Sequence, residues 1–531
     1  MGFQFLLVFF FLSLSLHTQL FSNAETVTTV YSSKLIHRFS GEAASYWASK
    51  GRNTTPPQLG SLEHMKLLLN SDFKRQRLKL GSLNRLLVPS QGSETFFYGN
   101  DMGWLHYTWI DIGTPNISFL VALDAGSDLL WVPCDCIQCA PLSSSYYSML
   151  DKDLGEYNPS RSTTSKSLSC SHQLCELGPN CQSPKESCPY TVNYYSENTS
   201  SSGFLFEDQL HLASFGAGAN EGLVQAQVIV GCGRKQSGIY LDGSAPDGVM
   251  GLGPAKISVP SLLAKSGLVP HSFSLCFNNS YSGRIYFGDQ GPSAQRTATF
   301  VPFEGKYSGY FVKVEDYCIG SLCLKQTGFQ AQVDSGSSFT YLPNEDYETL
   351  VAEFDKRVNA TRSGIEGFPY CYKARSHGQP NVPSMKFMFA MNQSFVIENP
   401  MFHIINYQGV DLYCLGIQPI DGEIGLIGQN FMTGYRMVFD WENLKLGWSH
   451  SNCQDISDNK KVHLAPPPND ASVNPLPNEQ QRTPSGRAVA PAVAGRAPAE
   501  PSAASPLLIL YQYCTISLLL LQLTFWLHYS F

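Results

Sequence analysis

Charged residues are scarce in this chain of 531 residues, since Asp, Glu, Lys and Arg together make up 15% of it. The formal net charge is -7 at pH 7, so no surplus of basic residues offers a surface to nucleic acid, and we expect no such partner. Of the whole chain, 43% is hydrophobic, and 44 Gly and 32 Pro interrupt it. This composition predicts a strand-rich globular body with many turns, and the length predicts at least two domains.

Patterns for metal and cofactor binding are also missing. The cluster Cys134-Asp-Cys136-Ile-Gln-Cys139 resembles half of a zinc site, but no second cysteine pair or histidine pair accompanies it, which favours disulfides. The glycine-rich segment 216–222 lacks the spacing of a phosphate-binding or dinucleotide-binding loop. His37, His271 and Cys276 do not assemble a Ser/His or Cys/His site. The sequence therefore predicts neither a metal ion nor a cofactor.

The N-terminus and the cysteines indicate secretion. Residues 1–24 predict a signal peptide, because an apolar run precedes the small residues Ser22 and Ala24, although no Lys or Arg precedes that run. Fourteen of the 15 cysteines lie between Cys134 and Cys453, which predicts seven disulfides of open connectivity in an oxidising compartment. Six sequons are candidates for N-glycosylation, at Asn53, Asn116, Asn198, Asn278, Asn359 and Asn392.

The C-terminus contains no charged residue after position 506, so no basic segment follows its apolar run as in a usual membrane span. Residues 454–506, rich in Pro and Ala, predict a disordered stalk with the attachment region of a glycolipid (GPI) anchor, and 507–531 a hydrophobic tail removed on anchoring. Ser502 is the candidate attachment residue, and a position near Gly495 is the alternative because the spacer after Ser502 is short. A retained span is the alternative to the anchor. We expect the protein on the outer face of the plasma membrane.

Residues 25–95 differ in charge from the rest of the chain. They hold ten of the 36 basic residues and five of the 43 acidic residues, and they lack cysteine. The remaining chain keeps 26 basic and 38 acidic residues, so a basic segment precedes an acidic body. We interpret 25–95 as a pro-segment held partly by charge, with a short accessory subdomain as the alternative.

The chain contains a repeat in two parts. VALDAGSDLLWVPC at 121–134 is matched by AQVDSGSSFTYLPN at 331–344, and DGVMGLG at 247–253 is echoed by GEIGLIGQ at 422–429. The segment 105–127 reads as a hairpin that ends at Asp124. The first half is longer and holds most of the cysteines, which predicts a Cys-rich insertion there. Two similar lobes are expected, at 96–292 and 293–453.

Two equivalent turns related by a pseudo-two-fold axis would bring Asp124 and Asp334 together. Two carboxyls in contact share one proton, so one acts as a base on water while the other donates to a carbonyl oxygen. The remaining residues of the two motifs are the candidates that support this pair: Gly126 and Gly336 for close backbone approach, Ser127 and Ser337 as hydroxyl donors.

These paired motifs resemble those of the pepsin-like aspartic proteases, in the plant nucellin-like and nepenthesin-like branch with glycolipid-anchored members. The resemblance covers about residues 100 to 453. It implies an all-β, bilobal fold with two β lobes related by a pseudo-two-fold axis, and a β-hairpin flap over a central cleft. It also implies a monomeric aspartic endopeptidase that acts on a peptide or protein substrate.

The chain departs from the family pattern at two places. The segment CPYTVNYYSENTSSSG is one residue longer than the usual flap, so the flap tyrosine is Tyr194 or Tyr195, and we favour Tyr194. Trp131 matches the tryptophan that supports it, with plain core packing as the alternative. Ala125 stands where the family usually has Thr, which removes a hydrogen bond worth about 1 kcal/mol. The alternative function is therefore a weak or inactive pepsin-like protein that acts as a binding module.

Overall fold

The computed structural model describes residues 86–454, except 99–101, 104, 148, 176–180, 197, 216–221, 279–281, 306–307, 325–327, 374–378, 398–399 and 408. Every described residue belongs to one compact unit, Lys79–Phe531. The predicted signal peptide, most of the predicted pro-segment, almost all of the stalk and the tail lie outside the described residues. Within the described residues, no helix is long and apolar enough to cross a membrane.

Strands dominate the described residues, as the composition predicted, and they form four sheets. The largest has 15 strands in the order β1-β8-β9-β5-β10-β4-β3-β2-β12-β11-β26-β27-β13, with β6 and β7 paired to β8. Its strands are β1 (Leu86–Pro89), β2 (Glu94–Phe97), β3 (His106–Ile112), β4 (Ile117–Asp124), β5 (Leu130–Gln138), β6 (Lys166–Ser167), β7 (Pro189–Asn193), β8 (Ser200–Phe215), β9 (Leu223–Ser237), β10 (Val249–Gly251), β11 (Ser272–Phe277), β12 (Ser282–Phe287), β13 (Arg296–Thr299), β26 (Tyr435–Asp440) and β27 (Lys445–His450).

The three smaller sheets have the orders β14-β17-β25-β18-β24, β16-β15-β20-β21 and β19-β23-β22. Their strands are β14 (Phe311–Val314), β15 (Asp316–Ile319), β16 (Leu322–Leu324), β17 (Phe329–Val333), β18 (Thr340–Pro343), β19 (Cys371–Lys373), β20 (Met385–Phe389), β21 (Gln393–Ile397), β22 (Met401–Tyr407), β23 (Val410–Leu415), β24 (Ile417–Ile420) and β25 (Ile424–Ile427). The described helices are short: α4 (Val259–Lys265), α5 (Asn344–Asp355), α6 (Gln429–Met432), and the 3-10 helices η2 (Ser144–Tyr146), η3 (Pro159–Arg161), η4 (Gly238–Tyr240) and η5 (Ala390–Asn392).

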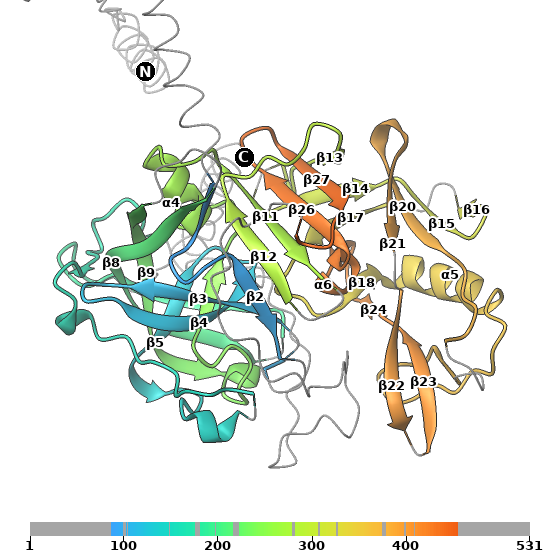
Figure 1. The fold of residues 1–531 in the computed structure, drawn as a ribbon, viewed down its shortest axis with the longest axis horizontal. Coiled ribbons are helices and arrows are strands. Elements are labelled where there is room, and N and C mark those ends of the chain that lie inside the picture. The colour runs from blue at the N-terminus through green and yellow to red at the C-terminus, as the bar shows by residue number, and fades with distance from the viewer. Residues whose placement is uncertain are drawn as a thin grey trace, which may run out of the picture. The chain divides into compact units, whose positions relative to one another are not determined.

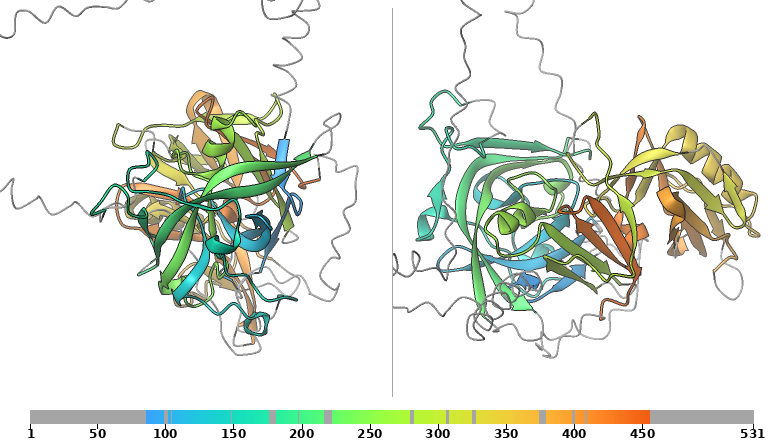
Figure 2. Two further views of the ribbon diagram at one scale, coloured as in Figure 1. Left: turned by 90° about the vertical axis from the view of Figure 1, so that its left-hand side faces the viewer. Right: turned by 90° about the horizontal axis from the view of Figure 1, so that it is seen from above.

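The strands group into two β lobes, which confirms the predicted all-β, bilobal fold. In Figure 1, β3, β4, β5, β8 and β9 lie on one side, β20 to β23 and α5 lie on the other, and β11, β12, β26 and β27 lie between them. Figure 2 shows from above that β26 and β27, drawn in orange-red, stand between the two groups. Strand β26 pairs with β11, and β27 follows β26, so these two strands extend the sheet of the first lobe. One sheet therefore contains strands from the beginning and from the end of the described chain.

The N-terminal edge of the described chain belongs to the same sheet. Strand β1 pairs antiparallel with β8 from Leu86 to Pro89, and β2 pairs with both β12 and β3. Residues 86–95, the end of the predicted pro-segment, therefore form β1 and the start of β2 in the large sheet.

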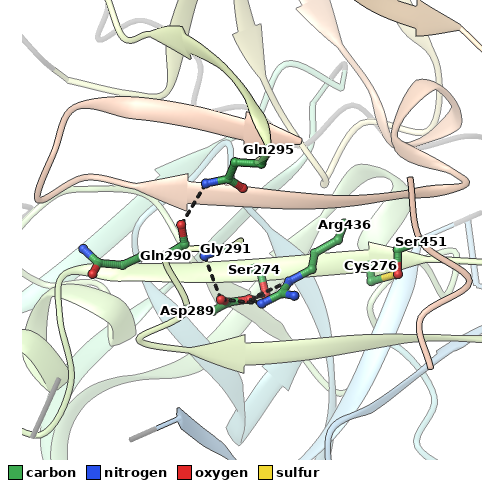
Figure 3. Close-up of polar contacts among 8 residues, drawn as sticks. All are labelled: Ser274, Cys276, Asp289, Gln290, Gly291, Gln295, Arg436 and Ser451. Carbon is green, nitrogen blue, oxygen red and sulfur yellow. Dashed lines mark hydrogen bonds and ion pairs between the residues drawn. The ribbon is translucent and has the colours of Figure 1, made fainter. Parts of the chain in front are cut away.

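A buried ion pair fastens the shared sheet. Arg436 of β26 donates through Nη2 to Asp289 Oδ1 at 2.6 Å and through Nε to Oδ2 at 2.9 Å, while Ser274 of β11 and the Gly291 N–H donate to the same carboxylate (Figure 3). Only 5% of the Asp289 side chain is exposed, so its charge depends on these donors. Nearby, Cys276 of β11 is bonded to Cys453. The end of the described chain is thus connected to the first lobe by an ion pair and by a disulfide.

All fourteen cysteines between Cys134 and Cys453 pair, which confirms the seven predicted disulfides. The pairs are Cys134–Cys232, Cys136–Cys139, Cys170–Cys181, Cys175–Cys188, Cys276–Cys453, Cys318–Cys323 and Cys371–Cys414. Three of them lie within residues 136–188, from the end of β5 to the start of β7, where strands and helices are short. Disulfides stabilise such a segment because they restrict the unfolded chain.

Candidate active site

The two repeated aspartates occupy equivalent positions at the ends of strands. Asp124 is the last residue of β4, and Asp334 directly follows β17. The predicted hairpin is confirmed, because β3 pairs antiparallel with β4 up to Tyr107 opposite Ala122. A hairpin delivers Asp124 in the first lobe, and the antiparallel pair β14 and β17 delivers Asp334 in the second.

Each aspartate is held by its own turn in the same way. The Gly126 N–H donates to Asp124 Oδ1 at 2.8 Å, and the Ser127 hydroxyl donates to Asp124 Oδ2. In the second lobe the Gly336 N–H donates to Asp334 Oδ1 at 2.8 Å, and the Ser337 hydroxyl donates to Asp334 Oδ2 at 2.6 Å. The structure thus places all four predicted supporting residues on the two carboxyls.

The apolar-Gly segments lie behind these turns. Strand β10 runs parallel to β4 with Gly251 opposite Asp124, and β25 runs parallel to β17 with Ile427 opposite Val333. A Cβ on Gly251 would lie 2.2 Å from the Asp128 carbonyl carbon, and a Cβ on Gly428 would lie 2.0 Å from the Phe339 carbonyl oxygen. Only glycine lets the turn approach its partner strand so closely.

The two turns meet face to face. A Cβ built on Gly126 would lie 2.6 Å from Asp334 Cγ, so the second carboxyl packs directly against the first turn. The Gln332 amide nitrogen donates to the Gly126 carbonyl oxygen at 3.3 Å. The Ser335 hydroxyl accepts from the Ala125 N–H at 3.0 Å and donates to the Leu123 carbonyl oxygen at 2.8 Å. Ala125 has no hydroxyl, so the first lobe does not form the equivalent pair of side-chain hydrogen bonds with the second lobe at this position.

Burial and mutual charge control the two carboxyls. Asp124 is 1% exposed and Asp334 is 0% exposed. Burial raises the pKa of Asp124 well above its ordinary value, and the charge of Asp334 raises it further, while Ser127 and the Gly126 N–H act in the opposite direction. Burial also raises the pKa of Asp334, against the donors Ser337 and Gly336. Such a pair keeps one proton between its two carboxyls, so it contains a base and an acid at once.

A cluster of aromatic rings supports the hairpin β7–β8, which corresponds to the expected flap. The Trp131 Nε1–H donates to the Tyr194 hydroxyl at 2.8 Å, and Tyr194 is 4% exposed. Tyr195 instead is 43% exposed. The structure therefore joins Trp131 to Tyr194, the tyrosine that the sequence favoured. Tyr240 completes the cluster, with ring centroids 5.2 Å from Trp131 and 5.1 Å from Tyr194.

Two buried groups of the first lobe, Tyr240 and Asp247, were not predicted from the sequence. Nothing in the sequence around Tyr240 singles it out, because a tyrosine in a short 3-10 helix has no characteristic spacing. Asp247 begins the DGVMGLG segment but was not considered as an ionisable group, although it is completely buried and accepts from the Leu120 N–H at 2.6 Å. For Asp247, the signal available in the sequence was an acidic residue directly before an apolar strand.

The cysteines do not leave a ligand set for a metal ion in the described part of the chain. Cys170, Cys175 and Cys181 lie close enough to share an ion, but each of them is already in a disulfide. The carboxyls of Asp124 and Asp334, called the dyad below, accept hydrogen bonds from their own turns, and Asp334 packs against the turn of Asp124.

The candidate glycosylation sites differ in exposure. Asn116, Asn198, Asn359 and Asn392 are exposed, whereas Asn278 is partly buried and donates to the Asn452 carbonyl oxygen at 3.3 Å. Asn53 and Ser502 lie outside the described residues. Glycosylation remains a prediction at each of these positions.

Comparisons with known proteins cover both lobes. The family models described as "Xylanase inhibitor N-terminal" and "Xylanase inhibitor C-terminal" match residues 106–289 and 310–450. "Aspartic proteinase-like protein 1" of Arabidopsis thaliana is 55% identical over 91% of this chain and 92% of its own length. "Aspartic proteinase nepenthesin-2" of Nepenthes gracilis is 23% identical over 73% of this chain and 86% of its own length.

A solved structure, that of the basic 7S globulin from soybean, matches with a TM-score of 0.53. The match covers 71% of this chain and 97% of the globulin, at 19% identity. At that identity the similarity shows the fold alone.

Proposed function

Because this chain belongs to the family of pepsin-like aspartic proteases, we propose that it is an aspartic endopeptidase that hydrolyses peptide bonds of a peptide or protein substrate. The observation that carries the proposal is the pair Asp124 and Asp334, two buried carboxyls in contact with matching donors on each. A protein that only binds its partner has no need to keep two mutually repelling acids buried together.

The proposed mechanism follows from the proton that the pair shares. Burial raises the pKa of both Asp124 and Asp334, and their mutual repulsion keeps one proton on the pair. We assign that proton to Asp124, so that Asp334 is the base. Asp334 takes a proton from the attacking water, whose oxygen bonds to the carbonyl carbon, while Asp124 donates its proton to the carbonyl oxygen. Collapse of the tetrahedral intermediate returns a proton to Asp124 and transfers the one on Asp334 to the leaving amine nitrogen. No covalent bond to the enzyme forms.

The test is hydrolysis of an unfolded protein by the form that lacks residues 25–85 and keeps β1 and β2, at pH values from 3 to 7. We expect cleavage at acidic pH, where one carboxyl of the pair is protonated, and inhibition by a pepstatin-type peptide that mimics the tetrahedral intermediate. Absence of cleavage at every pH, with the folded state verified by circular dichroism, would contradict the proposal.

A second candidate function is a catalytically weak or inactive binding module. The contact at Ala125 favours it. The Ser335 hydroxyl forms hydrogen bonds with the first lobe, whereas Ala125 has no hydroxyl that could form equivalent bonds with the second lobe. The same assay separates the two, since a binding module would bind the pepstatin-type peptide weakly and leave the unfolded protein intact.

We further propose that the enzyme is held on the outer face of the plasma membrane by a glycolipid anchor. Its support is in the sequence: the cysteines paired in seven disulfides indicate the secretory pathway, and residues 507–531 form an apolar segment without Asp, Glu, Lys or Arg after a stretch rich in Pro and Ala. Phosphatidylinositol-specific phospholipase C should release it from intact cells without residues 507–531. Peptides from 507–531 found on the cell-surface protein would instead support a retained span.

A further inference from the structure

A pocket lies in the first lobe where the Cys-rich insertion packs on strands β8 and β9 (Figure 1). Its volume is about 610 Å³, which falls within the range of about 300–1,000 Å³ of small-molecule sites. Its described lining includes neither aspartate of the dyad. The residues used below are Asp135, Glu156, Arg161, Phe204, Phe206 and Arg234.

Two phenylalanine rings form the apolar part of the pocket. Phe204 and Phe206 stand two residues apart on β8, so their side chains project from the same face of the strand. Both side chains are partly exposed, and the guanidinium carbon of Arg234 lies 6.0 Å from the centroid of the Phe204 ring. The rings therefore offer apolar surface that a ligand can cover.

Disulfides and an ion pair hold the polar edge of the pocket in place. Asp135 lies between Cys134 and Cys136, each of which is in a disulfide, and its backbone is in the left-handed region with a φ of 44°. Arg234 Nη2 lies 2.8 Å from Asp135 Oδ2. The Cys136 N–H donates to Glu156 Oε1 at 2.9 Å. The polar groups are thus fixed before a ligand arrives, which lowers the entropic cost of binding.

The charges that line the pocket balance. The two carboxylates belong to Asp135 and Glu156, and the two guanidiniums belong to Arg161 and Arg234. The exposed guanidinium of Arg161 makes no hydrogen bond or ion pair with another described residue, so its donors are available to a ligand. A charged ligand would be attracted by one pair of groups and repelled by the other. The pocket therefore favours a neutral ligand with many polar groups.

The sheet edges in this region are closed to an added peptide strand. Phe204 pairs with Cys232 of β9 on one side and with Pro189 of β7 on the other. Phe206 is likewise paired on both sides, with β9 and β6. An extended peptide gains affinity mainly through backbone hydrogen bonds to a free strand edge, and β8 offers none here.

A sugar matches both parts of the pocket. The face of a pyranose ring exposes C–H groups that can cover an aromatic ring, and its hydroxyls both donate and accept hydrogen bonds. Carboxylates supply acceptors and guanidiniums supply donors for those hydroxyls. Rings and polar groups that converge in this way give a ligand its affinity and its orientation.

The turn that carries the sequon Asn116 is bonded to the segment that lines the pocket. The Thr114 N–H donates to Ser162 Oγ at 3.0 Å, and the Thr163 N–H donates to the Thr114 carbonyl oxygen at 2.8 Å. Ser162 and Thr163 directly follow Arg161, and Asn116 is exposed. A glycan on Asn116 would therefore begin two residues from a backbone that contacts this segment.

We propose that the pocket binds a neutral carbohydrate, which is either an oligosaccharide from the surroundings or the glycan on Asn116. Phe204 and Phe206 cover the face of a sugar ring, and Arg161 donates to its hydroxyls. The site uses no residue of the dyad, so the proposal does not depend on the peptidase function.

The test is titration calorimetry of the glycosylated protein with three neutral probes: cellohexaose, xylohexaose and chitotetraose. Phe206→Ala should weaken binding about tenfold or more because it removes a ring, and Arg161→Ala about fivefold because it removes donors. Ile137→Ala and Lys166→Ala are the matched controls, since each removes an exposed side chain of the same kind outside the lining. They should leave the Kd within about twofold. Circular dichroism verifies the fold of each variant.

Asn116→Gln separates the two sources of carbohydrate. Binding of a probe by the wild type supports an external oligosaccharide, and binding by Asn116→Gln alone supports occupation of the pocket by the glycan on Asn116. The proposal is overturned if neither protein binds any of the three probes, or if Phe206→Ala and Arg161→Ala bind as the wild type does. Tighter binding of the anionic hexagalacturonide or of a hexapeptide than of all three probes would refute the neutral carbohydrate as the ligand class.

Discussion

The free energy of unfolding should fall between pH 4 and pH 7 because of Asp247, and Asp247→Asn should abolish this decrease. The carboxyl is completely buried, and its Oδ2 accepts from the Leu120 N–H at 2.6 Å. Burial raises the pKa of Asp247 from its ordinary value of 3.8 to about 8, although the Leu120 N–H and the charge of Lys152 act in the opposite direction. The folded protein therefore keeps a proton here that the unfolded chain releases near pH 4.

The magnitude follows from linkage between proton binding and folding. Between pH 4 and pH 8 the folded state binds one more proton than the unfolded state, so the free energy of unfolding falls by about 1.4 kcal/mol for each pH unit. The stabilising contribution of the protonated Asp247 carboxyl to the free energy of unfolding is complete below pH 3.8 and is lost as the pH rises through about 8. From pH 4 to pH 7 the loss is about 4 kcal/mol. Asn resembles the protonated carboxyl in shape, keeps an acceptor for Leu120 and does not titrate.

The assay is urea unfolding followed by tryptophan fluorescence at pH 4, 5, 6 and 7. Asp247→Asn should match the wild type near pH 4 and exceed its free energy of unfolding by up to about 4 kcal/mol at pH 7. A difference between the two proteins that stays constant with pH would refute this reasoning, because the carboxyl would then titrate alike in the folded and unfolded states.

Asp111→Asn is a control with the opposite sign. Burial raises the pKa of Asp111, but the donors Ser118, Ser90 and Gln91 together outweigh burial, so the pKa is lowered overall. Its stabilising contribution is present above the ordinary pKa and is lost as the pH falls through the lowered value. Asp111→Asn should therefore destabilise the protein by a nearly constant amount from pH 4 to pH 7, and the effect should decline only below the ordinary pKa of 3.8.

Three further predictions concern the dyad and the sheet that joins the lobes. Asp124→Asn and Asp334→Asn should each lower kcat by at least about 1,000-fold without lowering the unfolding temperature, because each change removes a buried carboxyl that repels its partner; a variant with most of its turnover would disprove the assignment. Ala125→Thr should raise kcat or shift the pH–rate profile by returning a hydroxyl to the contact between lobes, and identical profiles would show that this contact is not limiting. Arg436→Met should lower the free energy of unfolding by about 3–5 kcal/mol, because it leaves the Asp289 carboxylate buried without its counter-ion. The double variant with Asp289→Asn should be less destabilised than Arg436→Met, and additive effects would show that the pair is not coupled.

The close contact of Asp124 and Asp334 could be predicted because it depends on repetition along the chain. Both copies carry the same residues at the same offsets, so each turn folds by the same local hydrogen bonds, from the glycine N–H and the serine hydroxyl to the preceding carboxyl. Short-range geometry of this kind is fixed by neighbouring residues. The hairpin ending at Asp124 was predictable for the same reason, whereas the presence of disulfides was predicted from the fourteen cysteines of a chain expected to be secreted.

Pairing between distant segments that are not copies of one another was not predictable, because it depends on which surfaces meet after folding. The sequence left seven disulfides without connectivity, and the structure joins Cys134 to Cys232 and Cys276 to Cys453 across 98 and 177 residues. It also brings β26 beside β11, in a sheet that the division into lobes at 292 and 293 did not anticipate. No local signal specifies such partners.

By itself, the sequence determined the two carboxyl turns, the glycines behind them and the strand-rich class of the fold, since each of these follows from residues within a few positions of one another. The tertiary structure alone decided the environment of each group. It buried Asp247 completely, set Tyr240 against Trp131, and left Tyr195 exposed beside a buried Tyr194. Burial and electric field at a side chain are sums over atoms from many distant segments, so the pKa of an acid and the exposure of a ring appear only when the chain has folded.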